Sequence, residues 1–150
     1  MSLSYQIQRA IYQFWPAKQG LFTSGQVQTL GKTFSWVYDC GTSSKVAILD
    51  QPIKEMKQSL PNERLDLLAI SHFHKDHKSG IDRLRKDITI ENILLPYYSL
   101  WQRLVMAVLL GYEGKDLIEY IYPLQALHKK GIKAKNVIIV TKNLKSAKPT

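Results

Sequence analysis

Four side chains that commonly bind metal ions occur within one short segment, His72-Phe73-His74-Lys75-Asp76-His77. Histidine nitrogens and carboxylate oxygens are good zinc ligands, and a tight loop after a strand projects several of them into one small volume. Residues at i and i+2 of an extended backbone point the same way, so we expect His72 and His74 to bind one metal ion. Asp76 and His77 follow the turn and are placed to reach a second ion. Two ions about 3.5–4 Å apart can share a bridging hydroxide and stabilise the transition state of a hydrolysis.

The alternative for this segment is a solvated loop whose histidines bind no metal. The chain contains four histidines in all, and the placement of three of them in this register by chance is improbable. The fourth, His128, stands beside Lys129 at the expected end of a helix, where a cationic side chain interacts favourably with the helix dipole. We therefore expect the metal ligands at 72–77 and not at His128.

The elements that must position these ligands alternate between strands and helices. The histidine segment directly follows residues 65–70, a short apolar run typical of a buried strand. β-branched and aromatic residues bounded by turn signals predict the other strands, at 5–15, between the turns at 19–22 and 29–32, and at 33–38, 88–95 and 137–141. Helical spacing of apolar residues predicts helices at 43–60, 79–85, 100–110 and 116–130, the last interrupted at Pro123. This alternation predicts a layered α/β (α+β) domain.

Three sequence motifs, which occur along the chain in the same order as in the family, resemble those of the metallo-β-lactamase fold. Residues 67–80 resemble the His-x-His-x-Asp-His motif of its hydrolases, and Asp39-Cys40-Gly41 resembles the Asp-x-Gly that ends an earlier strand of that fold. Gln19-Gly20 is similar to the Gly-Gln-Gly turn of the subgroup that includes competence-type DNA-uptake proteins, with Lys18 where that subgroup usually has glycine.

The resemblance implies a metal-dependent hydrolase that uses metal-activated hydroxide. His72 and His74 would bind the first metal ion, and Asp76 and His77 the second. Asp76 would also orient the attacking water, and Asp39 would support the ligands from behind. The implied cofactor is one or two Zn2+ ions, with Mn2+ or Fe as alternatives, and the implied substrate is a phosphodiester, ester or amide. The competence-type similarity and the basic end of the chain favour a phosphodiester or nucleic acid.

The resemblance covers about the first half of the family's four-layer αβ/βα sandwich. We therefore assign residues 1–142 to the N-terminal half of that fold and residues 143–150 to a frayed basic tail. The complete family site uses two more histidines and a bridging aspartate from the second half, whereas this sequence offers only His128 and no acidic residue after Glu119. Three interpretations stay open: an active hydrolase, a catalytically inactive remnant or binding module, and a subunit whose site is completed by another copy or a second chain.

Composition limits the class of protein. A chain of 150 residues with 45% hydrophobic and 22% charged residues fits one folded domain. Its single cysteine, Cys40, allows no disulfide within the chain and favours a reducing cytoplasm. We expect Cys40 to pack inward and not to bind metal. No secretory signal is visible, and the longest apolar run, residues 104–110, is far short of the ~20 residues that span a bilayer, so we expect a soluble, cytoplasmic protein with no membrane association.

Charge and apolar surface raise the question of partners. The net charge is +9, but seven lysines and no acidic residue follow His128, so the first 128 residues carry only +2. This end of the chain is either a solvated lysine-rich tail or a phosphate-binding one. The helix expected at 100–110 has a wide apolar face that either belongs to the core or favours association with another chain.

Overall fold

The computed structural model describes residues 6–141, which form a mixed α/β domain around one six-stranded sheet. The strands follow the chain order across the sheet, from β1 to β6. They are β1 (Ile7–Phe14), β2 (Phe22–Thr29), β3 (Lys32–Cys40), β4 (Arg64–Ala69), β5 (Thr89–Pro96) and β6 (Ala134–Val140). The first three strands pair antiparallel, and β3 to β6 pair parallel. The predicted α/β class is confirmed.

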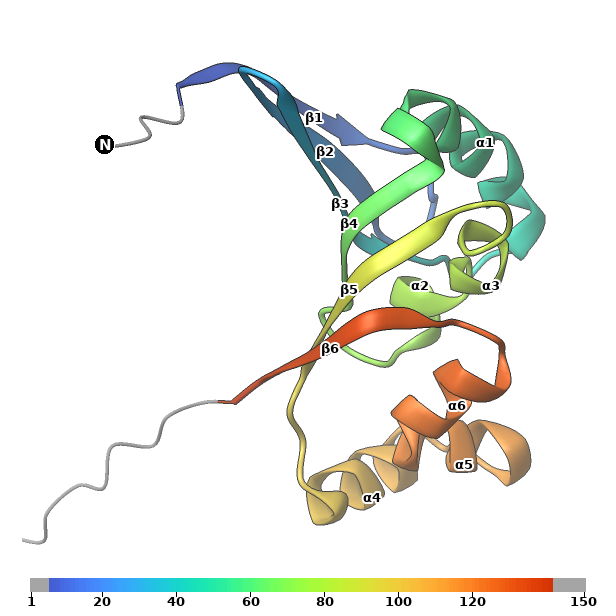
Figure 1. Ribbon diagram of the computed structural model, residues 1–150. Coiled ribbons are helices and arrows are strands. Elements are labelled where there is room, and N and C mark those ends of the chain that lie inside the picture. The colour runs from blue at the N-terminus through green and yellow to red at the C-terminus, as the bar shows by residue number, and fades with distance from the viewer. Residues whose placement is uncertain (1–5, 142–150) are drawn as a thin grey trace, which may run out of the picture.

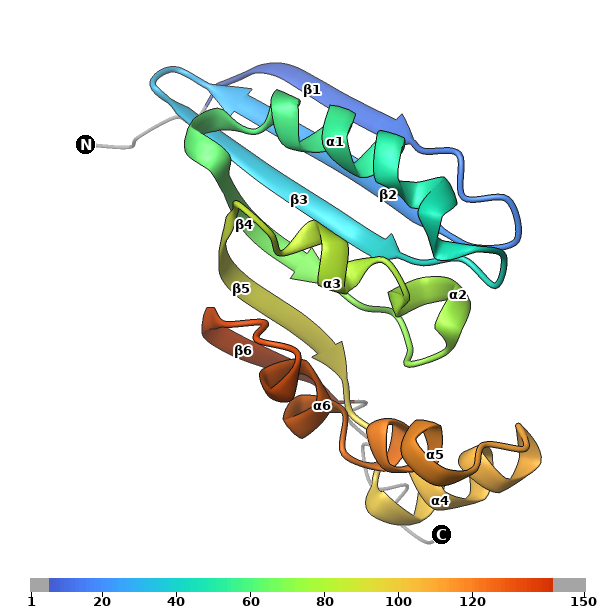
Figure 2. The same cartoon turned by 90° about the vertical axis from the view of Figure 1, so that its right-hand side faces the viewer.

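Helices connect the parallel strands. They are the 3-10 turns η1 (Val46–Leu49) and η2 (Pro61–Glu63) and the helices α1 (Asp50–Ser59), α2 (Lys75–Lys78), α3 (Ile81–Leu84), α4 (Leu100–Leu109), α5 (Gly114–Ile121) and α6 (Pro123–Lys129). Figure 1 and Figure 2 show α1, α3 and α6 over the same face of the sheet, and Figure 2 shows α2 beyond the carboxyl ends of β3 and β4. Parallel strands need such crossover connections, because a tight turn can join only antiparallel neighbours.

The core lies between this helical layer and the sheet. Ile53 and Met56 of α1 are buried in one cluster with Val37 of β3 and Leu68 of β4. Helical spacing in α1 and alternation in the strands bring these side chains to a common interface. Each buried side chain of this size contributes about 1.5–3 kcal/mol relative to exposure, so this interface holds the sheet and α1 together.

Local chemistry explains where several elements begin and end. Pro123 divides the helix predicted at 116–130 into α5 and α6, as expected, because proline cannot donate the backbone hydrogen bond of a continuous helix. Ser99 and Gln102 form a reciprocal capping box at the start of α4. The single turn α2 is absent from the predicted set, and β6 begins at Ala134, earlier than predicted.

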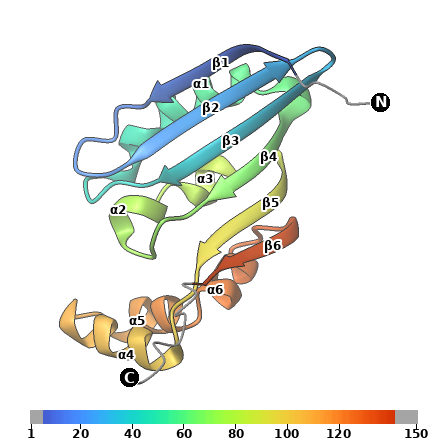
Figure 3. The same cartoon turned by 90° about the vertical axis from the view of Figure 1, so that its left-hand side faces the viewer.

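The opposite face of the sheet carries no helix in the described part of the chain, as Figure 3 shows. Strand pairing places Tyr12, Gly25 and Trp36 in one row of this face. The missing side chain of Gly25 leaves room for the Trp36 indole, since a Cβ there would lie 2.3 Å from Trp36 Cζ2, and the Tyr12 and Trp36 rings are 5.7 Å apart. Phe14, in the neighbouring row, is 83% exposed.

Apolar side chains are also exposed on α4. Ala107 is the buried residue of this helix, whereas Trp101 is 72% exposed and Val108 and Leu109 are each 74% exposed. None of the helices within residues 6–141 has the length and apolar character needed to cross a bilayer. The tail predicted at 143–150 lies outside the described residues.

Candidate metal centre

The histidine segment forms the connection from β4 to α2. Ile70 donates its backbone N–H to Leu94 O of β5 (2.9 Å), so the segment leaves the sheet directly afterwards. Phe73 is 3% exposed and belongs to the core cluster. His72 and His74, on either side of it, are half-buried.

Because Gly20 and Gly41 have no side chains, the loop that carries the histidines can pack directly against the backbone at these two positions. A Cβ on Gly41 would be 2.5 Å from the backbone N and C of His77, and one on Gly20 would be 2.8 Å from Asp76 O. Leu21 donates its backbone N–H to Asp76 O (3.0 Å). The two glycine-containing motifs of the sequence therefore pack against the backbone of the histidine segment.

Three of the four predicted ligands converge. His72, Asp76 and His77 each offer one ligand atom within 4.8 Å of the others, and all three residues are half-buried. His77 Nε2 lies 3.3 Å from Asp76 Oδ2. Ligand atoms bound about 2.0–2.2 Å from one zinc ion are roughly 3–4 Å apart, and the pair of His77 and Asp76 has this spacing.

His74 lies beside this group but outside it. Its ring centroid is 4.5 Å from that of His72, whereas the His72 and His77 centroids are 3.7 Å apart. The sequence pairs His72 with His74, but the helical turn of α2 folds Asp76 and His77 back toward His72. The structure thus brings His72 together with the two residues that were assigned to a second ion.

Asp39 contacts the cluster from the side of β3. Its side chain is fully buried, and its Oδ2 accepts a hydrogen bond from His77 Nδ1 (2.7 Å). A carboxylate only accepts, so the proton of a neutral His77 sits on Nδ1 and leaves the Nε2 lone pair available. Asp39 thereby fixes the nitrogen that faces Asp76.

Ser71 also contacts the cluster, and the motif did not single it out. Its backbone N–H and its hydroxyl both donate to Asp39, at 2.7 and 2.6 Å. With its proton directed to Asp39, the Ser71 oxygen is left to accept from His72 Nδ1, which is 2.9 Å away. His72 then also presents Nε2 as its free nitrogen. The one sequence feature that could have pointed to this role of Ser71 was a small polar residue directly before the first histidine.

Electrostatics favour the metal-binding form of His72. Burial lowers its pKa, and the nearby His77 and His74 lower it further. Metal binding requires neutral imidazole, so a lowered pKa extends the pH range in which the ligand is ready.

Cys40 lies outside the cluster that His72, Asp76 and His77 form in the described part of the chain. Burial, reinforced by the charge of Asp39, raises the pKa of its thiol, which therefore stays protonated. It packs in the core as predicted. His128 lies exposed in the last turn of α6, also as predicted.

Two tyrosines form a wall beside the cluster and were not predicted. Tyr120 of α5 is buried, and its ring centroid lies 6.0 Å from that of His74 and 5.1 Å from that of Tyr112. Burial raises the pKa of Tyr112, and the negative charge of Asp76 adds to the effect.

Comparison with known proteins leaves the family open. The chain matches no protein-family model, and no curated protein matches it.

Proposed function

We propose that this chain is a metal-dependent hydrolase domain of the metallo-β-lactamase type, with Zn2+ at His72, Asp76 and His77. The observation that carries the proposal is the convergence of three ligand atoms within 4.8 Å. The donor set supports it, since two imidazoles and a carboxylate form a common catalytic zinc site with one position left open. A bound divalent ion supplies Lewis acidity, which lowers the pKa of a water molecule and stabilises developing anionic charge.

The chain's own groups would act around that ion. Asp76 is partly exposed and is placed to accept a hydrogen bond from an incoming water molecule and so to orient it. Asp39 keeps the Nδ1 proton of His77 in place, and Ser71 does the same for His72. The finer fold assignment, the first half of a four-layer sandwich, is part of the proposal. The open sheet face supports it, because a second layer would cover this face.

A second candidate is a metal-binding module whose site is completed by another copy or a second polypeptide. Two observations favour it. Three ligand atoms converge in the described part of the chain, fewer than two ions need, and the sheet face that carries Tyr12, Trp36 and Phe14 is uncovered there. The lysine-rich end would in either case favour a phosphodiester or nucleic-acid substrate.

The first test is calorimetric titration of the full chain with Zn2+ and Mn2+ near neutral pH. We expect binding of at least one ion, with affinity at least tenfold lower in His72→Ala. His128→Ala is the matched control, because this exposed histidine lies outside the cluster. Equal affinities in wild type and both variants would remove the metal site from the proposal.

The second test separates the two candidates. A generic phosphodiester and single-stranded DNA are incubated with Zn2+ or Mn2+ and with wild type, Asp76→Asn or Asp87→Asn. Loss of a charge that orients the nucleophile should lower the rate at least 100-fold, whereas a change at a partly exposed residue usually alters stability by under about 0.5 kcal/mol. Asp87 is exposed, so Asp87→Asn should keep the rate. A protein that binds metal but hydrolyses neither substrate would favour the binding module.

A further inference from the structure

A cavity of about 380 Å³ opens beside the candidate metal centre, between α2 and α5. Its lining includes Lys75, Lys78, Tyr112, Asp116, Tyr120 and Lys130. Lys75 and Lys78 are in the same helical turn as Asp76, and Tyr120 contacts the ring of His74, so the cavity adjoins the cluster. A molecule in it would lie next to any ion held there.

The charges in this cavity favour an anion. Glu119 also lines the cavity and pairs with Lys130 at 2.8 Å, so these two charges cancel. Lys78 is half-buried, and within residues 6–141 neither it nor Lys75 forms an ion pair. Asp116 offsets one of these two charges and leaves an excess of one lysine. A partly buried ammonium without a carboxylate partner is stabilised by an anion that supplies charge-assisted hydrogen bonds.

The other wall is aromatic. The rings of Tyr112 and Tyr120 are inclined by 44° with centroids 5.1 Å apart, and Tyr112 is half-buried. Aromatic side chains beside a basic groove are the usual means of holding a nucleotide base by stacking. The volume is near the lower end of small-molecule sites, roughly 300–1,000 Å³, which suits one nucleotide unit and not a long stretch of polymer.

We propose that this cavity binds a single nucleotide unit, with the phosphate at Lys75 and Lys78 and the base against Tyr112. The inference rests on the proposed function in one respect: it names the part of a phosphodiester substrate that lies beside the metal centre. Binding itself needs no metal ion, so it can be tested separately.

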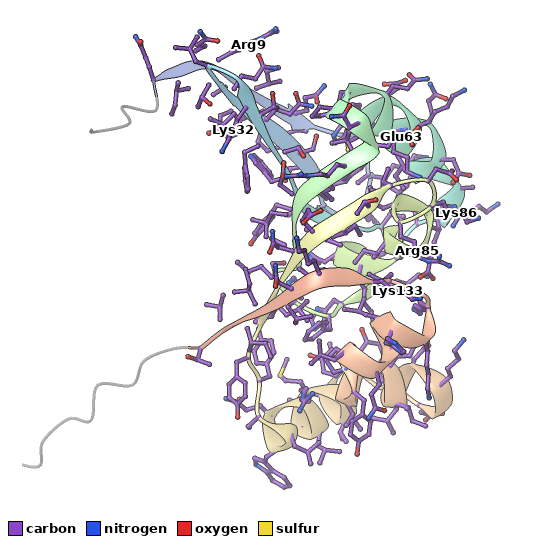
Figure 4. The ribbon with its side chains drawn as sticks, viewed as in Figure 1. Arg9, Lys32, Glu63, Arg85, Lys86 and Lys133 are labelled. Atoms are coloured by element: carbon purple, nitrogen blue, oxygen red, sulfur yellow. The ribbon has the colours of Figure 1, made fainter. Side chains whose placement is uncertain are left out.

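The test is an NMR titration of the isotope-labelled full chain with adenosine 5′-monophosphate in the presence of a chelator. We expect saturable shifts of α2 and α5 resonances and a Kd about tenfold higher for Lys78→Gln. Lys78→Arg keeps the charge and should bind within threefold of wild type. Lys133→Gln removes an identical charge from an exposed position between α6 and β6 (Figure 4) and should leave the Kd unchanged.

Inorganic phosphate tests the aromatic wall. It should bind more weakly than the nucleotide, and Tyr112→Leu should weaken the nucleotide without affecting phosphate. Equal Kd values for Lys78→Gln and Lys133→Gln, in variants whose spectra show a folded protein, would overturn the proposal, and so would equal affinity for phosphate and nucleotide. A chain that binds the nucleotide but no Zn2+ would refute the hydrolase and keep the cavity. Zn2+ binding without nucleotide binding would refute the nucleotide-binding cavity and leave the proposed hydrolase in place.

Discussion

Replacement of Asp39 by asparagine tests how the candidate metal centre is held together. Oδ2 of Asp39 accepts from His77 Nδ1 and the Ser71 hydroxyl, and Oδ1 accepts from Ser71 N–H. An amide of the same shape has only one acceptor oxygen. One orientation places the NH2 group against His77, and the other places it against the Ser71 N–H. In both, His77 loses the negative charge that raises its basicity as a ligand.

The expected magnitude follows from these contacts. Loss of an outer carboxylate that orients a metal-binding histidine typically lowers metal affinity 10- to 100-fold, or about 1.4–2.7 kcal/mol. Asp39 is fully buried, so stability should also fall by about 1.5–3 kcal/mol, the worth of one hydrogen bond to a charged group. Zinc calorimetry measures the first effect and urea unfolding in a chelator measures the second.

Asp66 provides a matched control. This buried carboxylate of β4 accepts from Ser35 N–H (2.8 Å) and is paired with Arg64, and it takes no part in the histidine cluster. Asp66→Asn should cost comparable stability and leave zinc affinity within about twofold. If the two variants lost zinc affinity equally, the loss would come from general destabilisation, and the role assigned to Asp39 would be refuted.

Three further predictions concern acid stability, the loop and α4. Burial raises the pKa of Asp66, but hydrogen bonds from Ser35 and Arg64 outweigh burial and lower the pKa overall. The stability that the ionised carboxylate contributes is therefore present above about pH 4 and is lost as the pH falls. Asp66→Asn should make the free energy of unfolding in urea less dependent on pH in this acid range. Gly41→Ala should cost about 2–3 kcal/mol and abolish zinc binding through the clash with the loop, whereas Gly111→Ala, with open space but a positive φ, should cost about 1 kcal/mol and keep zinc in the same calorimetric assay. Light scattering should show association of the wild type that Val108→Lys reduces, and a clean monomer for both would contradict a role of α4 in association.

The sequence predicted the features that depend on local patterns. Alternating apolar and polar residues located the strands, helical spacing of apolar residues located the long helices, and Pro123 indicated the interruption between α5 and α6. The single turn α2 was missed because Lys-Asp-His-Lys has no apolar period. That omission also explains the ligand grouping, since the i and i+2 rule applies to the extended backbone only as far as His74. Tyr112 and Tyr120 reach the site through tertiary packing, which no spacing along the chain encodes.

The contacts of Gly20 and Gly41 position the backbone of the histidine loop independently of the side chains that could bind a metal ion. Main-chain atoms, such as Asp76 O bound by Leu21 N–H, fix where the loop runs, whatever side chains project from it. In the proposed metal centre, exchange of His72 or Asp76 for another coordinating residue would therefore alter which metal is preferred without dismantling the loop. In evolutionary terms, such a preference could drift while the fold stays constant, and in engineering terms the loop would serve as a scaffold for ligand exchange as long as both glycines are kept.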